Sequence, residues 1–203
     1  MTERKEHWEN IYAKKSFEEV SWFQKHPETS IGLIGSCRPD TDDKIIDIGG
    51  GDSYLAEHFL KTGFSAISVL DISQNVLNRA QERIGPNSSN INWICSDIVD
   101  FTPSDSYQIW HDRAVFHFLT SNDEISKYVS LVNRAIHSGG YLILGTFAKD
   151  GPTKCSGLEI SQYDRAHLEQ LFTEFELVSS HRVDHETPFD SIQKFTFVVF
   201  KKR

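Results

Sequence analysis

The sequence predicts an α/β protein, a three-layer sandwich whose mostly parallel seven-stranded sheet has an antiparallel last strand. Three observations predict it. Short apolar runs alternate with segments of helical periodicity, three glycines follow the first such run, and no helix separates the last two runs. Strands that alternate with helices need crossover connections and so form a parallel sheet, whereas two strands without an intervening helix form a hairpin.

The expected elements follow one another regularly along the chain. Strands are expected at residues 44–48, 65–70, 91–95, 108–112, 141–147, 176–182 and 193–200. Helices are expected at residues 53–61, 74–84, 122–137 and 165–172. The final strand contains FTFVVF, which is apolar on both faces and suits a position covered on both sides. Residues 1–40 carry several aromatic side chains and are expected to form a helical cap over a core of residues 41–203.

Composition narrows the class of protein. The chain has 203 residues, of which 38% are hydrophobic and 25% charged, so residues 1–203 are expected to form a single domain. Its net charge of −8 makes nucleic acid a poor partner. No apolar run approaches the roughly 20 residues of a membrane span, so no membrane partner is expected. Three cysteines without CxxC spacing fit a reducing compartment, which predicts a cytoplasmic protein.

The stretch IIDIGGGDSYLA places a bare backbone turn between a strand and a helix. In an open parallel sheet this turn lies at the carboxyl edge of the strands, where ligands bind. The dinucleotide fingerprint G-x-G-x-x-G fails, because Tyr54 stands at its third glycine. An acid two residues before Gly49 would also sit poorly beside a pyrophosphate, which argues against NAD and nucleotide-sugar enzymes. Asp47 instead suits a ligand that carries a positive charge.

The same turn resembles that of the class I (seven-β-strand, Rossmann-like) S-adenosylmethionine-dependent methyltransferases. Their pattern is acid-x-G-x-G-x-G, and Asp47, Gly49 and Gly51 match it, although Ser53 replaces the last glycine. The resemblance implies that the cofactor is S-adenosylmethionine, which carries a sulfonium, an amino group and a ribose diol but no phosphate.

Acids at the ends of three further strands support the resemblance. Asp71 ends the second expected strand and can accept hydrogen bonds from both ribose hydroxyls. The resemblance implies that Asp97 binds the adenine amino group, that Ile98 covers the ring, and that residues after the fourth strand contact the methionine end. The cofactor-binding residues expected in this way, with the cap aromatics described next, are Trp8, Tyr12, Trp22, Asp47, Gly49, Gly50, Gly51, Asp71, Ile72, Asp97, Ile98, Asp112 and Arg113.

Aromatic residues cluster before the first strand. Trp8 and Tyr12 are four residues apart and therefore share a helix face, and Trp22 and Phe23 follow. They either pack as ordinary core or form a lid whose aromatic faces lie over the cationic cofactor. The W-x3-Y…SWF pattern is similar to that of small bacterial and organellar methyltransferases, some of which modify protein lysines.

The acceptor is less clearly marked than the cofactor. Residues 154–157 and 185–193 are expected to form the acceptor wall, where Cys155 and Gln193 could face a substrate, while Trp8, Trp22, Phe116 and Phe118 could build an aromatic chamber. Candidate catalytic residues are Asp112, His117 and His185. His111, His117, His181 and His185 suggest zinc only weakly, because none of them forms an i, i+4 pair on an expected helix, and no metal is expected.

Three functions remain open from the sequence. The favoured one is an S-adenosylmethionine-dependent methyltransferase that acts on a small molecule. A protein lysine methyltransferase is the alternative, and it needs a nearby group to take the proton of the lysine, for which Asp112 is the obvious candidate. A non-catalytic S-adenosylmethionine-binding protein is the third.

Overall fold

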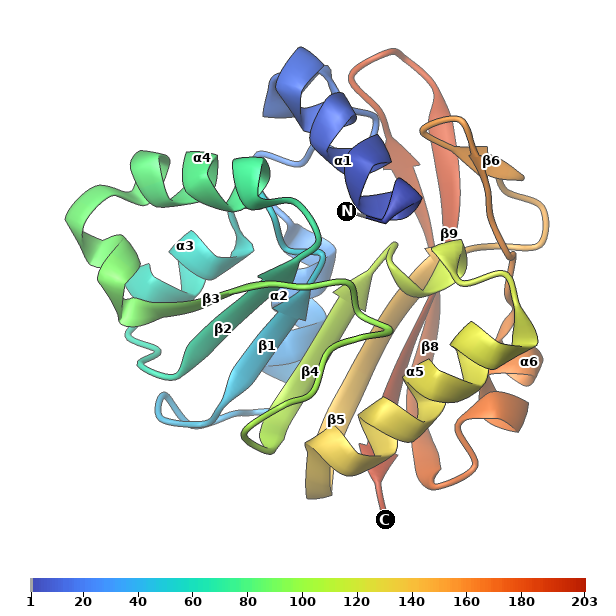
Figure 1. The fold of residues 1–203 in the computed structure, drawn as a ribbon. Helices are drawn as coiled ribbons and strands as arrows, with labels where there is room; N and C mark the ends of the chain where they lie inside the picture. The colour runs from blue at the N-terminus through green and yellow to red at the C-terminus, as the bar shows by residue number, and fades with distance from the viewer. Residues whose placement is uncertain (1) are drawn as a thin grey trace.

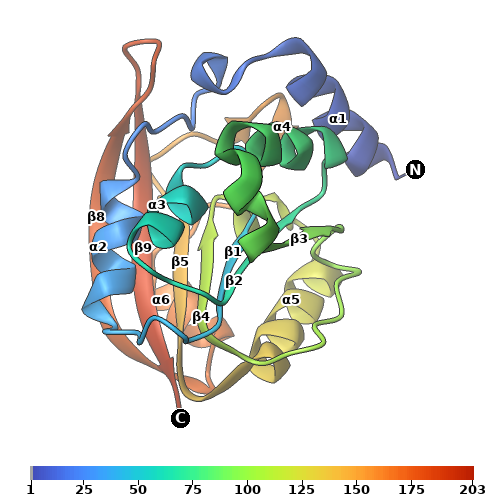
Figure 2. The ribbon, with the colours of Figure 1, turned by 90° about the vertical axis from the view of Figure 1, so that its left-hand side faces the viewer.

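In the computed structural model, which describes residues 2–203, a seven-stranded sheet runs between helices on both of its faces (Figures 1 and 2). The strand order is β3-β2-β1-β4-β5-β9-β8. The strands are β1 (Ile45–Ile48), β2 (Ile67–Asp71), β3 (Ile91–Cys95), β4 (Tyr107–Arg113), β5 (Ile136–Phe147), β8 (Phe175–Glu186) and β9 (Ile192–Lys202).

Strand directions agree with the sequence pattern. Strands β1 to β5 pair in parallel, whereas β9 runs antiparallel to both of its neighbours, β5 and β8. Val198 and Val199 of β9 are buried in the two different cores on opposite faces of the sheet. The predicted Rossmann-like sandwich with an antiparallel last strand is therefore confirmed.

Two helical layers cover the sheet. Helices α2 (Glu28–Ser36), α3 (Leu55–Lys61) and α4 (Gln74–Ile84) contribute apolar side chains to one core, and α5 (Asn122–Ala135) and α6 (Arg165–Leu171) to the other. Helix α2 falls within the segment for which the sequence predicts a cap. It is nevertheless part of the sandwich, because Leu33 and Ile34 pack with Ile45 and Ile109 of the sheet.

Helix α1 (Glu3–Lys14) is separate from these layers. It lies over the carboxyl ends of the strands, beside α4 and the hairpin of β8 and β9 (Figure 1). A one-turn helix, η1 (Phe17–Glu19), follows α1. No helix within residues 2–203 is long and apolar enough to cross a membrane.

Helix starts follow local side-chain chemistry. The Ser73 hydroxyl caps α4 by accepting the Val76 N–H at 3.3 Å. Asp52 or Ser53 is expected to cap the helix after the glycines, yet α3 begins later, at Leu55, with Tyr54 at the N-cap position. Asp52 does not cap the helix and instead forms an ion pair with Arg79 at 2.6 Å, while the Ser53 hydroxyl accepts the Leu55 N–H at 3.1 Å.

Some short elements have no counterpart in the sequence prediction. They are the two-stranded ribbon of β6 (Lys154–Cys155) and β7 (Leu158–Glu159) and the one- to two-turn helices η2 (Gly85–Asn90) and η3 (Phe116–Phe118). The ribbon β6–β7 and helix η3 both lie toward the edge of the sheet that α1 covers (Figure 1). They therefore add walls to the ligand edge.

Candidate functional site

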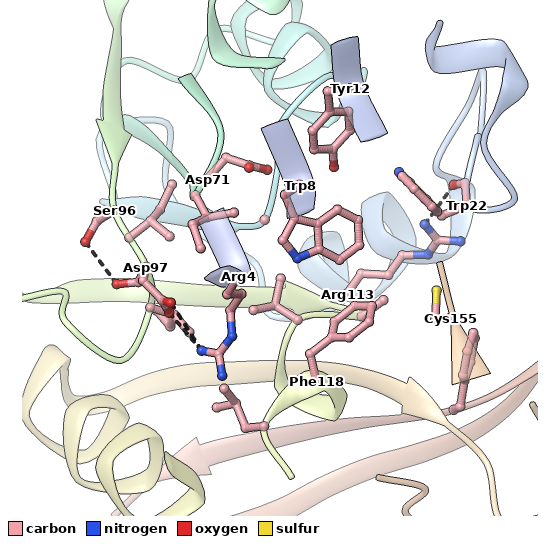
Figure 3. Close-up of a pocket in the computed structure, with 18 of the residues that line it drawn as sticks. Arg4, Trp8, Tyr12, Trp22, Asp71, Ser96, Asp97, Arg113, Phe118 and Cys155 are labelled. Carbon is pink, nitrogen blue, oxygen red and sulfur yellow. Dashed lines mark hydrogen bonds and ion pairs between the residues drawn. The ribbon is translucent and has the colours of Figure 1, made fainter. Parts of the chain in front are cut away.

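A cavity of about 820 Å³, counting the open space at its mouth, lies between α1 and the carboxyl ends of the strands (Figure 3). Nine of the residues expected from the sequence to bind the cofactor line it: Trp8, Tyr12, Trp22, Gly49, Asp71, Ile72, Asp97, Ile98 and Arg113. Phe118, Cys155 and Gln193 from the expected acceptor side line it as well. A second hollow of about 500 Å³ surrounds Asp47 and Gly50 and shares Gly49 and Arg113 with the first. The two hollows together form one continuous candidate site.

The glycine turn after β1 is shaped by close approach. Gly49 has a φ of +65°, and a Cβ atom there would lie 2.2 Å from the Val115 side chain. Gly51 has a φ of +38°, and its Cβ would lie 2.8 Å from the carboxylate of Asp71. Any side chain at these positions would clash with the loops that follow β2 and β4. The turn therefore brings bare backbone next to the acid that ends β2.

Asp47 lies in a buried polar chain beside this turn. Its Oδ1 atom is 2.7 Å from Nδ1 of His111, and Nε2 of His111 is 2.9 Å from the Ser30 hydroxyl in α2. Asp47 and His111 are register partners in β1 and β4, so the sheet itself sets this contact. The chain fixes the orientation of the Asp47 carboxylate in the second hollow.

Asp71 is the acid at the end of β2. It is buried, and its Oδ1 atom accepts the Ser73 N–H at 2.9 Å. Burial, together with the nearby charges of Asp47 and Glu9, raises the pKa of Asp71 to about 7. Ligand hydroxyl donors at this carboxylate would favour its charged form.

Asp97 is paired with the cap. Nη1 of Arg4, on α1, lies 3.2 Å from both carboxylate oxygens of Asp97 (Figure 3). The same guanidinium also contacts Glu124 at the start of α5. Arg4, Trp8 and Tyr12 are spaced by four residues and so share one face of α1. The cap therefore reaches the acid that the resemblance assigns to the adenine.

Arg113, at the end of β4, faces the cavity. Its Nη1 atom donates to the Trp22 carbonyl at 3.1 Å, and its guanidinium carbon lies 5.2 Å from the centre of the Phe195 ring. Its Nη2 atom has no hydrogen-bond partner among the described residues. Burial lowers the pKa of Arg113 to about 10, so it stays charged at neutral pH.

Asp112 points the other way, and its expected place in the site is wrong. Successive residues of a strand face opposite sides of the sheet, so Arg113 reaches the cavity and Asp112 the core beneath α5. The Asp112 carboxylate is fully buried, accepts the Tyr128 hydroxyl at 2.5 Å and the Val115 N–H at 2.9 Å, and is absent from the cavity lining within residues 2–203. It closes the turn after β4 instead of contacting a ligand.

The two candidate histidines also have structural hydrogen bonds. His117 is fully buried behind the cavity, and its Nδ1 atom accepts the Phe147 N–H at 3.3 Å. Burial and the charge of Arg113 lower the pKa of His117 to about 3, which makes it a poor base. The ring of His185 bonds through Nε2 to the Ser21 carbonyl at 2.8 Å, beside Trp22. Neither ring is among the described residues that line the cavity.

The aromatic chamber differs in part from the expected one. Trp8 packs edge to face against Phe118 at 5.1 Å and against Trp22 at 5.9 Å between ring centres. Phe116, also expected there, is fully buried among core aromatics. Its place in the chamber is taken by Phe147 and Phe195, which pack edge to face at 4.8 Å between ring centres and line the cavity.

Comparison with known proteins agrees with this geometry. Residues 45–140, which contain the glycine turn, Asp71, Asp97 and Arg113, match a family described as a methyltransferase domain. The structure of the N-methyltransferase NodS from Bradyrhizobium japonicum WM9, in complex with S-adenosyl-L-homocysteine, has a TM-score of 0.71 at 14% identity and covers 96% of this chain and 97% of that one. Residues 45–140 therefore form a methyltransferase domain, on a fold that solved S-adenosylmethionine-dependent methyltransferases share. The cofactor of this methyltransferase is S-adenosylmethionine, as the sequence predicts.

Two curated relatives are similar to it over much of its length. A malonyl-[acyl-carrier protein] O-methyltransferase 2 from Ilyobacter polytropus is 26% identical over 67% of this chain and 51% of its own. An eEF1A lysine and N-terminal methyltransferase from Mus musculus is 23% identical over 98% of this chain and 28% of its own. The methyltransferase thus spans about half of the first relative and just over a quarter of the second.

Several residues of the methyltransferase site have weak sequence signals. The four-residue spacing of Arg4, Trp8 and Tyr12 could have found Arg4, and strand alternation could have placed His111 on the side of Arg113. Phe147 and Phe195 lie in apolar strands that read as core, so nothing local marks them. Among the described residues, no group of three or more His, Cys, Asp or Glu side chains is arranged to hold a metal ion.

Proposed function

We propose that this methyltransferase transfers a methyl group from S-adenosylmethionine to a small-molecule acceptor. The carrying observation is the aromatic half of the cavity, which is walled by Trp8, Trp22, Phe118, Phe147 and Phe195 from five separate segments of the chain. Such walls favour the burial of a compact, partly apolar molecule and exclude water from the reacting atoms.

The residues of the site divide the work. Asp71 is placed to accept the ribose hydroxyls next to the bare backbone of Gly51, and Asp97 with Ile98 to hold the adenine. S-adenosylmethionine supplies a methyl group already activated on a sulfonium, so the protein's contribution is alignment and desolvation. Asp47 is held by His111 in the second hollow, where it suits the amino group of the methionine end.

A protein lysine acceptor remains the second candidate, because the lysine and N-terminal methyltransferase relative aligns with 98% of this chain. A lysine must lose a proton before it can attack. Asp112, which the sequence offers as its base, is bonded to Tyr128 on the far side of β4. This position weakens the lysine reading and supports the small molecule.

The test uses S-adenosylmethionine with a deuterated methyl group and follows where this methyl group is transferred. The protein is incubated with a small-molecule extract and, separately, with a protein extract, and both are analysed by mass spectrometry. We expect deuterated methyl groups in the small-molecule fraction. Label confined to lysines of the protein fraction would contradict the proposal in favour of the alternative, and binding without any transfer would support a non-catalytic role.

A further inference from the structure

Four charged side chains line the main cavity, and one of them, Arg113, keeps a guanidinium nitrogen without a hydrogen-bond partner among the described residues. Arg4 and Asp97 pair with each other, and Asp71 accepts a backbone N–H beside the glycine turn. Arg113 uses Nη1 on the Trp22 carbonyl and leaves Nη2 unpaired among the described residues. An unpaired guanidinium nitrogen beside a cavity is a ready donor to an anion.

The resemblance places Arg113 at the methionine end of the cofactor, and Arg113 does line the second hollow beside Asp47, but its contacts extend into the acceptor half. Strand β4 lies between β1, which carries the glycine turn, and β5, which leads to Phe147. The guanidinium leans across β5 toward β9, where it stands over the ring of Phe195, and Cys155 lies close by (Figure 3). Within the described chain, Arg113 is the charged side chain of the half formed by Phe118, Phe147, Cys155 and Phe195.

This half of the cavity offers no group that takes up a proton at neutral pH. Burial raises the pKa of the Cys155 thiol to about 11, so the thiol keeps its own proton. The amide of Gln193 does not titrate and donates to the Ser21 hydroxyl at 3.1 Å. His117 and His185 are engaged with Phe147 and Ser21, and burial lowers the pKa of both. An acceptor that must first be deprotonated finds no base here.

We propose that the acceptor presents a carboxylate, which Arg113 binds and orients for methylation. This inference rests on the proposed function. One carboxylate oxygen uses a lone pair to form the bond to the methyl carbon, and the carbon–sulfur bond breaks with its electron pair left on sulfur. A sulfonium and a carboxylate become a neutral thioether and a neutral methyl ester, so no proton moves and no base is needed.

The experiment measures binding and turnover with matched probes. Benzoate, phenylacetate, hexanoate and decanoate are titrated into the protein saturated with S-adenosylhomocysteine, alongside phenylacetamide and 2-phenylethylamine. Methyl ester formation from S-adenosylmethionine is followed by mass spectrometry. We expect carboxylates to bind at least tenfold more tightly than the amide, and an ester from those that bind. No binding by any carboxylate, or preferred methylation of the amine, would overturn the inference.

Variants separate Arg113 from the rest of the site. Arg113→Gln should weaken carboxylate binding by roughly tenfold or more, and by a larger factor than it weakens S-adenosylhomocysteine binding. Arg113→Lys should recover part of the loss because the charge returns. Arg4→Gln, the matched change at the paired arginine, should keep the preference for carboxylate over amide.

Two outcomes for the cofactor complete the test. A tenfold loss of S-adenosylhomocysteine affinity in Arg113→Gln, with carboxylate preference unchanged, would assign Arg113 to the methionine carboxylate and overturn the inference. Absence of S-adenosylhomocysteine binding by the parent protein would refute the proposed function itself. If Arg113→Gln does not fold, the comparison of phenylacetate with phenylacetamide on the parent protein still decides.

Discussion

At the scale of single residues, Asp71 links cofactor affinity to pH. Its pKa in the free protein is raised by burial to about 7, and ribose hydroxyls that donate to it favour the charged form. Binding therefore lowers this pKa and releases a proton below pH 7. We expect affinity for adenosine, which carries the diol and does not titrate in this range, to be roughly tenfold higher at pH 8 than at pH 6 and level above.

Calorimetry across this pH range checks the expectation. Asp71→Asn should bind adenosine with little pH dependence and, at pH 8, more weakly by about 1.5–3 kcal/mol, the scale of a lost charge-assisted hydrogen bond. If the variant kept the pH dependence of the parent, another group would be its source. Asp97→Asn serves as the control, because the resemblance places Asp97 at the adenine and away from the ribose.

Gly51 allows a sharper test of the turn, since its missing Cβ is what lets the backbone approach Asp71. A Cβ would lie 2.8 Å from the carboxylate at a φ of +38°. Gly51→Ala should weaken S-adenosylhomocysteine binding by more than tenfold, measured by calorimetry. Gly63→Ala is the matched control, because Gly63 has a φ of +92° but no atom within 4 Å of its Cβ. Equal losses of affinity in the two variants would show that backbone strain, and not the contact with Asp71, causes the effect.

At the scale of elements, several polar contacts hold α1 to the core. Glu9 accepts the Ser73 hydroxyl at 2.7 Å and the Gln74 N–H at 2.8 Å at the start of α4, where the helix dipole favours an acid. Arg4 pairs with Asp97 at the opposite end. These contacts position the Trp8 ring over the cavity. Helix α1 therefore forms a roof over the cavity, and loosening its contacts with the core should weaken cofactor binding.

Glu9→Gln tests the roof. Loss of this charge should speed hydrogen exchange over residues 3–14 and weaken S-adenosylhomocysteine binding severalfold, while added S-adenosylhomocysteine slows exchange in the parent. Glu6→Gln is the matched change on the same helix, because Glu6 is exposed. Exchange that is unaffected by the cofactor and by Glu9→Gln would indicate that the cap aromatics are ordinary core.

Part of the structure could be predicted from the sequence and part could not. Apolar runs and helical periodicity predict the strands and helices of the sandwich, and the parallel topology predicts that the acids at the strand ends gather at one edge of the sheet. The role of α2 does not, because its apolar Leu33 and Ile34 read alike in a cap or in a core. Asp112 was misplaced because its partner Tyr128 is 16 residues away, and only the folded sheet shows which face each residue of β4 presents. The acceptor wall depends on such long-range pairings.

At the scale of the whole molecule, the sheet divides the site between its two halves. Strands β1, β2 and β3 end in the cofactor residues, whereas β5 and β9 supply the aromatic wall, and Arg113 stands between them on β4. Helix α1 bridges the two halves through Trp8, which contacts Phe118. A ligand that fills the cofactor half therefore touches the roof and the sheet together, which couples its binding to the stability of the domain.

This coupling predicts a selective thermal shift. S-adenosylhomocysteine at about 100 times its dissociation constant should add about 2.7 kcal/mol to the free energy of unfolding, which for a domain of this size raises Tm by roughly 5–10 °C. NAD at the same concentration should leave Tm unchanged, because its pyrophosphate would face the carboxylate of Asp47, and Tyr54 occupies the place of the third glycine. Differential scanning calorimetry at several ligand concentrations measures both. A shift with NAD and none with S-adenosylhomocysteine would contradict this interpretation of the glycine turn, because Asp47 and Tyr54 are the residues that separate the two ligands.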